Sequence, residues 1–321
     1  MNYNSLDCID AGTENCPCYL AVTGDCLLCT RLQGKDYCDC NWKGVCIYNE
    51  FIQGNGRVNN PRSDFEAKIV RKKYYLNDLA VFTLDVGKGF AIKASRPGSF
   101  VFLKDKNSKS FYETPLCIME TDINKGQLSV AVKIISAKTK TLADTEDSLI
   151  VRGVYRNGII GISAITGKDI KGKKILLIAK GIGLAPAMLA ANYLWYKNRV
   201  DLIIDPDKIS EEMISDYLGE GEGIIKYLSL SNPDDRKVLT DLLSREKYDS
   251  VIILTSDYYL KTISEIVKKK LPDAKIALSN NFKICCGEGV CGACSVTSGS
   301  DTFKMCKCQG LPEDVWLDNS N

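Results

Sequence analysis

Four cysteines near the end of the chain have a spacing that suits redox metal chemistry. They form the pattern Cys286-x4-Cys291-x2-Cys294, followed after eleven intervening residues by Cys306. Thiolates with this spacing hold a plant-type [2Fe–2S] cluster. The glycines between them let the backbone wrap tightly around two irons and direct N–H groups at the sulfides. A structural zinc site is the alternative, although a gap of four residues between the first two ligands suits zinc poorly.

A second group of cysteines occupies the start of the chain. Eight thiolates there could hold two four-cysteine sites, and the redox motif at the other end favours [4Fe–4S] clusters over structural zinc. Zinc and plain thiols remain the alternatives, and the spacing does not show which cysteines belong together. Cys285 and Cys308, beside the C-terminal motif, are interpreted as ordinary thiols. The eight are Cys8, Cys16, Cys18, Cys26, Cys29, Cys38, Cys40 and Cys46.

The composition limits the reactions and the partners. The chain has no histidine, which excludes Rieske ligation, histidine-containing zinc sites and a histidine base. Its 42 basic and 40 acidic residues are scattered, so we expect protein and small-molecule partners, with no nucleic acid and no membrane. The first residues lack the basic start and apolar run of a signal peptide. We therefore expect a cytoplasmic protein. In that compartment, closely spaced cysteines are interpreted as metal or redox ligands in preference to disulfides.

The elements that must position these cysteines divide the chain into four parts. Residues 1–60 lack hydrophobic periodicity and predict a small iron–sulfur or zinc module whose fold depends on metal. Residues 64–166 contain short β-type runs between turn residues, which predict an antiparallel barrel. The four barrel strands that we expect span 65–70, 79–86, 99–103 and 128–135.

From residue 170 to 283 the pattern changes to apolar strands that alternate with helices, which predicts a doubly wound parallel sheet. Residues 284–321 then form a cluster-binding tail. The predicted fold class is a multidomain α+β and α/β protein, in which the barrel precedes the parallel sheet. The expected strands span 175–179, 200–204, 224–230, 251–255 and 276–278, and the expected helices span 185–197, 208–218, 234–246 and 258–270.

Four short motifs fit this division. The turn Pro97-Gly98-Ser99-Phe100 opens a barrel strand, and Pro115-Leu116-Cys117-Ile118 follows in the barrel. Residues 138–142 read Lys-Thr-Lys-Thr-Leu. In the α/β part, residues 181–186 read Gly-Ile-Gly-Leu-Ala-Pro and lie between a strand and a helix. A phosphate-binding glycine loop requires that context.

With the tail motif, these segments make residues 64–316 resemble the electron-transfer subunit of dihydroorotate dehydrogenase type B, within the ferredoxin–NADP reductase superfamily. The small subunit of NADH-dependent ferredoxin:NADP oxidoreductases is similar. The resemblance implies an FAD-binding barrel, an NAD(P)-binding α/β domain and a [2Fe–2S] tail. It implies a flavin ring at Pro115, Leu116, Cys117 and Ile118, a flavin diphosphate near Lys138, Thr139, Thr141 and Leu142, and a nucleotide at Gly181, Gly183, Ala185 and Pro186.

The sequence departs from the family pattern in the flavin segment. The family has an arginine before the Pro-Leu pair, and this chain has Glu113 or Thr114 there. An arginine would offset the diphosphate charge, so a barrel without flavin is the alternative.

The nucleotide segments also depart from the family pattern. Ala179 and Lys180 replace two glycines, and Thr255-Ser256-Asp257 stands where the family has Cys-Gly-Pro beside the nicotinamide. The carboxylates of Asp205 and Asp207 follow the second α/β strand and would repel a nucleotide phosphate. A sheet retained only for docking is therefore the alternative to an NAD(P)H site.

These observations predict an iron–sulfur flavoprotein subunit that passes electrons between NAD(P)H or a partner oxidoreductase, FAD and its clusters. No side chain is expected to act as a general base. We expect a hetero-oligomer with one or more oxidoreductase subunits, and ferredoxin is a further candidate partner. The alternatives are a non-enzymatic electron-relay adaptor with a defunct nucleotide site, and a zinc-stabilised interaction protein.

Overall fold

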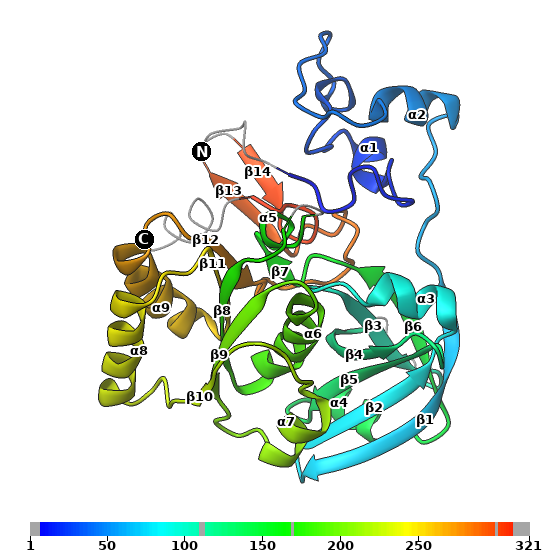
Figure 1. Cartoon of the computed structure of the whole chain (residues 1–321). Helices are drawn as coiled ribbons and strands as arrows, with labels where there is room; N and C mark the ends of the chain where they lie inside the picture. Colours follow the sequence, from blue (N-terminus) through cyan, green and yellow to red (C-terminus); the bar gives the residue numbers. More distant parts are fainter. Residues whose placement is uncertain (1–6, 109–112, 168–169, 299–300, 311–321) are drawn as a thin grey trace.

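The computed structural model describes residues 7–108, 113–167, 170–298 and 301–310. Figure 1 shows a small N-terminal module at the top, a barrel at the lower right and a layered α/β part at the left. The module lies next to the hairpin of β13 (Ser295–Ser298) and β14 (Asp301–Lys304) near the end of the chain. Both cysteine-rich regions therefore lie at the same end of the molecule.

Six antiparallel strands form a closed barrel in the order β1-β2-β5-β4-β3-β6. Alternate residues such as Phe82, Val101 and Ile118 point inward and fill its core. The four predicted barrel strands are confirmed as β1, β2, β3 and β5, and the barrel also contains β4 and β6. The strands are β1 (Asp64–Leu76), β2 (Leu79–Asp85), β3 (Phe100–Asp105), β4 (Thr114–Asp122), β5 (Gln127–Lys133) and β6 (Ser148–Tyr155), with helices α3 (Lys88–Ala94) and α4 (Ala137–Asp144).

The second sheet has the order β10-β9-β8-β11-β12-β7. Its strands pair in parallel except at one edge, where β7 (Ile159–Ile160) runs antiparallel to β12. The barrel ends at Tyr155. β7 lies within the range predicted for the barrel, 64–166, but it belongs to the second sheet. The parallel strands are β8 (Lys174–Lys180), β9 (Arg199–Asp205), β10 (Ile225–Tyr227), β11 (Ser250–Leu254) and β12 (Lys275–Ser279).

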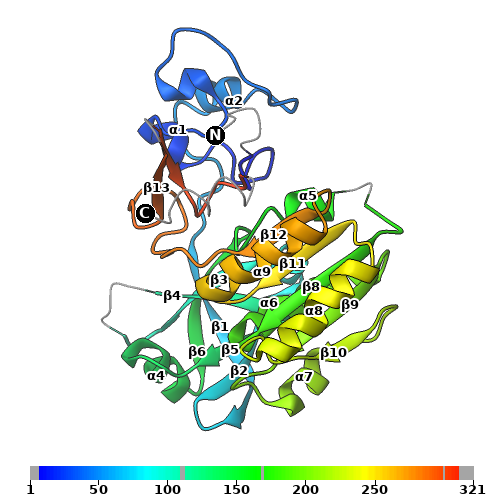
Figure 2. The ribbon, with the colours of Figure 1, turned by 90° about the vertical axis from the view of Figure 1, so that its left-hand side faces the viewer.

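Helices cover both faces of this sheet, as Figure 2 shows. One face packs against α6 (Leu184–Trp195) and α7 (Glu211–Tyr217), and its core continues into barrel residues such as Leu79 and Val81. The other face packs against α8 (Pro233–Arg245) and α9 (Asp257–Lys270). Successive residues of β8 point to opposite faces, and both faces are covered, which is why residues 175–179 are all apolar and buried. The predicted doubly wound sheet is confirmed.

The N-terminal module has little regular structure. It contains α1 (Tyr19–Thr23), a 3₁₀ turn (Thr30–Gln33) and α2 (Ile47–Gln53). Its small core consists of Cys16, Ala21, Cys29, Leu32 and Ile47. A core of this size is marginal by itself, so the module depends on contacts or ligands beyond its own apolar residues.

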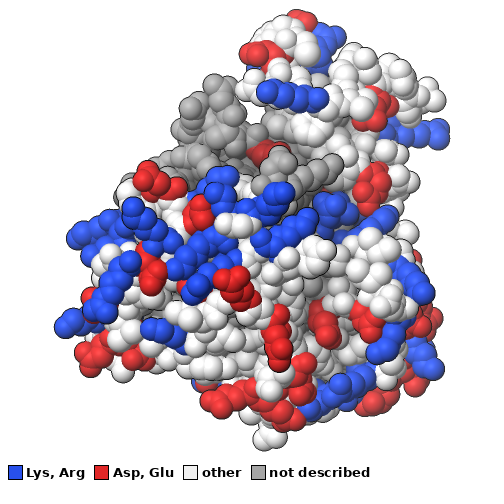
Figure 3. Space-filling view, viewed as in Figure 1, with Lys and Arg blue, Asp and Glu red and all other residues white. Residues whose placement is uncertain are grey.

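The surface in Figure 3 carries charges of both signs. Lys and Arg are denser below the N-terminal module, and Asp and Glu are denser toward the lower end of this face. In the described part of the chain, no helix combines the length and the apolar character needed to span a membrane.

Candidate functional site

The thiols of the C-terminal motif lie together. The backbone N–H of Glu288 donates to Cys286 Sγ (3.3 Å), and the N–H of Cys306 donates to Cys294 Sγ (3.4 Å). The Cys306 thiol is within hydrogen-bond reach of Cys286 and Cys294, which lowers the pKa of Cys286 to about 4 and that of Cys294 to about 7. Burial raises the pKa of Cys291, which also contacts Cys286. The pKa of Cys306 is raised in turn, because its thiol donates to Cys286 and Cys294. Backbone donors and the Cys306 thiol thus favour thiolates at Cys286 and Cys294.

Among the residues that the structure describes, no three Cys, Asp or Glu side chains converge as the ligands of one metal ion do. A [2Fe–2S] cluster does not require such convergence, because each iron takes two protein thiolates.

The first turn of this loop is seated on the barrel. Gly287 has φ +71°, and a Cβ there would lie 2.5 Å from the Tyr155 ring and 3.0 Å from that of Phe102. Only glycine permits this approach and this backbone conformation together. Tyr155 and Phe102 pack edge to face, with ring centroids 5.1 Å apart. The loop therefore rests on an aromatic surface at the ends of β3 and β6.

The same aromatic surface reaches a large cleft. Phe100 stacks on Tyr155, with centroids 5.2 Å apart, and Cys117 of β4 packs against this aromatic cluster. Cys117 also lines the cleft, so packed side chains join the Cys286 loop to the cleft without a gap in the chain of contacts.

The cleft has a volume of about 740 Å³ and lies between the barrel and the parallel sheet. It contains eight of the twelve residues predicted to bind cofactors: Pro115, Leu116, Cys117, Thr139, Gly181, Gly183, Ala185 and Pro186. The other four do not line it. Ile118 and Leu142 point into the barrel core, and Lys138 and Thr141 lie on helix α4, where the Thr141 hydroxyl donates to the Ala137 carbonyl.

The glycine loop lies at the end of β8, where the sequence analysis expected it. Gly181 has φ +56°, and a Cβ on Gly183 would overlap the Leu254 carbonyl oxygen at the end of β11. The loop therefore needs both glycines, one for its conformation and one for its close approach. In α/β sheets this edge is the usual place for a ligand.

Lys180 and Asp205 form an ion pair beside this loop. Lys180 Nζ lies 2.7 Å from Asp205 Oδ2, and the backbone N–H of Leu230 donates to the same oxygen (2.6 Å). The buried charge of Asp205 is therefore compensated within the protein. Asp207 lies 3.8 Å from Lys180, has a side chain that is 48% exposed and lines the cleft. Of the two carboxylates predicted to repel a nucleotide phosphate, Asp207 alone faces the cleft.

The segment at residues 255–257 also lines the cleft. The Asn281 amide donates to the Thr255 carbonyl oxygen (2.8 Å) and to the Asp257 carboxylate (2.9 Å). Asn281 thus holds this turn at the start of α9, opposite the glycine loop.

Arg152 is a cation that the sequence analysis missed. Its guanidinium pairs with Glu113, contacts the Tyr155 hydroxyl and donates to the Cys286 carbonyl oxygen (3.1 Å). Glu113, at the place of the arginine in the family that the sequence resembles, is thus neutralised by an arginine from β6. The sequence pattern predicted no strand over residues 148–155, so it did not single out this arginine. Arg152 does not line the cleft. Its contacts stabilise the Cys286 loop and do not reach a ligand in the cleft.

A buried ionic network joins the loop to the N-terminal module. Lys307 Nζ lies 2.6 Å from Asp10 and 2.9 Å from Glu288, and Arg62 lies 2.8 Å from Asp10 and 3.3 Å from Glu288. Burial alone would raise the pKa of Asp10, but Lys307 and Arg62 outweigh it and lower that pKa to about 2. Two cations and two carboxylates balance one another, which is the condition for burying them.

The N-terminal cysteines lie in two places within the module. Cys8, Cys16, Cys18 and Cys26 line one small cavity. Cys38, Cys40 and Cys46 are exposed, and Cys29 is buried between the two places.

Comparison with known proteins agrees with this architecture, although no family model matches the chain. An uncharacterized protein of Clostridium beijerinckii is 26% identical over 255 residues, covering 74% of this chain and 82% of that protein. Sulfhydrogenase 2 subunit gamma of Pyrococcus furiosus is 22% identical, covering 77% and 94%. A probable electron-transfer subunit of dihydroorotate dehydrogenase B (NAD(+)) of Methanothermobacter thermautotrophicus is 25% identical, covering 66% and 75%.

Solved structures share the fold. The NADH-dependent reduced ferredoxin–NADP oxidoreductase matches with a TM-score of 0.59 and 20% identity, covering 75% of this chain and 85% of that one. Phthalate dioxygenase reductase matches with a TM-score of 0.52 and 14% identity, covering 77% and 95%. The barrel and the parallel sheet have the arrangement found in these solved structures, and the chain is similar in sequence motifs and in fold to the ferredoxin–NADP reductase superfamily.

Proposed function

We propose that the chain is the electron-transfer subunit of an iron–sulfur flavoprotein oxidoreductase. The observation that carries this proposal is the unbroken packing from the Cys286 loop, through Phe100 and Tyr155, to Cys117 in the cleft. Such packing suits transfer between a group in the cleft and a cluster held by Cys286, Cys291, Cys294 and Cys306. The relatives named as electron-transfer subunits support the same role.

The residues of the cleft fit an FAD group. Pro115, Leu116 and Cys117 would lie against the flavin ring, and a diphosphate would lie at the start of α4, where Ser136 and Thr139 line the cleft. When bound, a flavin exchanges two electrons with a hydride donor and single electrons with a cluster. Burial raises the pKa of Cys117 to about 11, so this thiol stays protonated beside the ring.

The nucleotide for which the cleft is suited is NADH rather than NADPH. Lys180 is already paired with Asp205, and Asp207 presents a second carboxylate to the cleft 3.8 Å from the same lysine. Two carboxylates therefore share one cation at this place. A 2′-phosphate near Asp207 would be repelled, whereas a ribose hydroxyl would not.

The partners that we propose are oxidoreductase subunits in a hetero-oligomeric complex. Relatives named as subunits of a sulfhydrogenase and of dihydroorotate dehydrogenase B support this. Ferredoxin is a second candidate acceptor, since a related structure is a ferredoxin–NADP oxidoreductase.

A second candidate function is an electron relay without a nucleotide site. Thr255, Ser256 and Asp257 favour it, because they differ from the Cys-Gly-Pro turn that the related family has beside the nicotinamide. In that case electrons would enter and leave through partner subunits alone.

The test is an anaerobic titration of the purified chain with NADH and then NADPH, following the flavin and iron–sulfur absorption bands. Bleaching of both bands at stoichiometric NADH supports the reductase. Clusters that only dithionite reduces support the relay, and a colourless protein contradicts both. A Cys294→Ala variant should lose the [2Fe–2S] band, whereas Cys285→Ala, at an exposed thiol beside the motif, should keep it.

A further inference from the structure

Four N-terminal cysteines surround one enclosed space. Cys8, Cys16, Cys18 and Cys26 line a cavity of about 20 Å³, together with apolar residues that include Leu20 and Ile47. Cys16 and Cys18 are each only 8% exposed. Two of the four thiols are thus shielded from water, and Cys8 and Cys26 are partly exposed. The apolar residues around such a site control how solvent reaches it.

These four thiols are also electrostatic neighbours. Burial raises the pKa of Cys16 to about 12, and the nearby Cys18 and Cys26 raise it further. Burial likewise raises the pKa of Cys8, with contributions from Asp10 and Cys18. The four thiols therefore lie close to one another around a single cavity.

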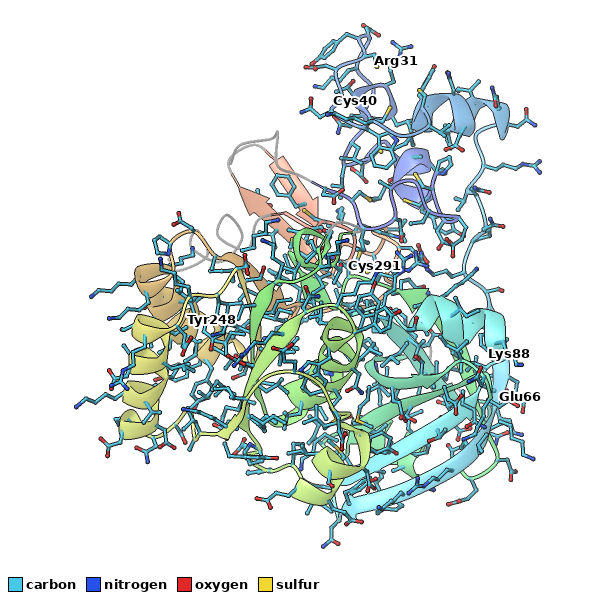
Figure 4. All side chains as sticks on the ribbon, in the orientation of Figure 1. Arg31, Cys40, Glu66, Lys88, Tyr248 and Cys291 are labelled. Atoms are coloured by element: carbon cyan, nitrogen blue, oxygen red, sulfur yellow. The ribbon has the colours of Figure 1, made fainter. Side chains whose placement is uncertain are left out.

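The remaining four cysteines form an outer group. The loop at residues 36–40 is folded back onto Thr30, whose hydroxyl donates to the Tyr37 carbonyl oxygen and accepts from the Asp39 N–H, each at 3.0 Å. This brings Cys38 and Cys40 beside Cys29, and Cys46 at the start of α2 is a further neighbour of Cys38. Figure 4 shows Cys40 in the outer part of the module.

We propose that the eight N-terminal cysteines pair as two iron–sulfur sites: an inner site of Cys8, Cys16, Cys18 and Cys26, and an outer site of Cys29, Cys38, Cys40 and Cys46. A four-iron cluster takes one thiolate per iron, so its ligands surround a space and need not converge on one ion. The inner thiols have that arrangement around their cavity.

The inner site adjoins the C-terminal cluster loop. Cys8 and Cys308 form a β-bridge, and Ile9 N–H donates to the Lys307 carbonyl oxygen (3.0 Å). Leu20 lines the inner cavity, and a Cβ on Gly289 of the loop would lie 2.5 Å from it. One apolar side chain thus separates the inner cavity from the loop that carries Cys286 and Cys291. In Figure 4 Cys291 lies at this junction.

This arrangement deepens the proposed function and rests on it for the direction of transfer. Single electrons would pass from the cleft to the C-terminal cluster, then to the inner site and then to the outer site, or in reverse. Each transfer oxidises one group and reduces the next by one electron, and no proton or bond is exchanged. The exposed outer cysteines would then be the place at which a partner takes or gives electrons.

The pairing is tested by metal analysis of the full chain, purified without oxygen. Iron, acid-labile sulfide and zinc are counted per chain in single Cys→Ala variants at Cys16, Cys26, Cys38 and Cys46. Each should lose about four irons. The double variant Cys16→Ala/Cys26→Ala should lose no more than either single variant, whereas Cys16→Ala/Cys38→Ala should lose about eight. Cys117→Ala, outside both groups, should lose none.

Additive losses for Cys16 and Cys26, or equal losses for Cys16→Ala and the Cys16/Cys38 double variant, would overturn the pairing. Zinc in place of iron would overturn the iron–sulfur assignment. Metal content does not depend on nucleotide, so a correct pairing with no reduction by NADH would reject the reductase and leave the two sites standing.

The order of the sites is tested by rapid freeze-quench electron paramagnetic resonance after reduction. Cys38→Ala should leave reduction of the inner and C-terminal clusters at the rate of the unmodified chain. Cys16→Ala should slow reduction of the outer site by tenfold or more. If the outer site is reduced at the same rate in Cys16→Ala and in the unmodified chain, the proposed order is wrong.

Discussion

At the scale of the residue, Gly287 decides how closely the Cys286 loop approaches the barrel. Gly287→Ala should lower the stability of the loop more than Gly292→Ala. Both glycines have positive φ, +71° and +73°, so alanine costs about 1–2 kcal/mol of backbone strain at either. At Gly287 the new Cβ also meets the Tyr155 ring, which adds about 1–3 kcal/mol.

The measurement is the denaturant concentration at which the iron–sulfur absorbance is lost, with iron per chain as a second readout. Gly292→Ala is the matched control, because its nearest contact would be Ser295 Oγ at 3.8 Å. Equal midpoints for the two variants would show that the close contact of Gly287 with the Tyr155 ring does not contribute to the stability of the loop.

Asp207 should set the preference between NADH and NADPH. Asp207→Asn removes the carboxylate that faces the cleft, and asparagine accepts the positive φ of 49° at this position. We expect the Kd ratio of NADPH to NADH to fall about fivefold at low salt, because an exposed charge contributes about 1 kcal/mol, and less as salt is added. Equilibrium titration at two salt concentrations measures it. Asp241→Asn, at an exposed carboxylate on α8, should leave the ratio unchanged.

At the scale of the elements, the buried ionic network joins the N-terminal module to the Cys286 loop. Asp10 comes from the module, Arg62 from the link to β1, and Glu288 and Lys307 from the C-terminal region. Tyr155 of β6 donates to Glu288 (2.9 Å), so the barrel takes part as well. Hydrogen bonds and opposite charges therefore fix three parts of the molecule at one point.

Breaking this network should release the module without unfolding the barrel. Asp10→Asn leaves Arg62 and Lys307 opposite one carboxylate, and an unbalanced buried charge costs about 3–5 kcal/mol. Hydrogen exchange should rise at Ile9 and Lys307, whose backbones are joined, while β2 and β5 stay protected.

The double variant Asp10→Asn/Lys307→Gln restores charge balance and should recover part of the protection. Asp122→Asn, at an ion pair whose lysine is 70% exposed, is the control and should change little. Protection that stays unchanged in Asp10→Asn would mean that apolar contacts alone hold the module.

At the scale of the whole molecule, the module and the two larger domains should differ in their dependence on metal. The barrel and the parallel sheet have extensive apolar cores, whereas the module has five buried apolar residues in its own cluster. Removing metal with a chelator and a reductant should therefore unfold residues 7–60 and leave residues 64–283 folded.

Hydrogen exchange with mass spectrometry, with and without chelator, measures this difference. Protection should fall in the peptides that contain α1 and α2 and persist in those from β8 and β11. If the module keeps its protection without metal, its fold does not depend on metal, and its contacts with the Cys286 loop are sufficient to stabilise it.

The sequence by itself determined the features that depend on local spacing. The pattern Cys286-x4-Cys291-x2-Cys294, the glycine loop at Gly181 and Gly183, and the alternation of strands and helices are encoded within short windows. Backbone geometry links residue type to conformation over a few residues, so these could be read without a structure. The fold class followed from them, and the glycine loop that they predicted lines the cleft.

Only the tertiary structure decided which distant groups meet. Nothing in the spacing pairs Cys8 with Cys26, joins Arg152 to Glu113, or neutralises Asp205 with Lys180. Lys307 and Asp10 are 297 residues apart in the chain and 2.6 Å apart in space. Such contacts depend on how whole domains pack, and burial of a charge selects its partner only after packing has removed water.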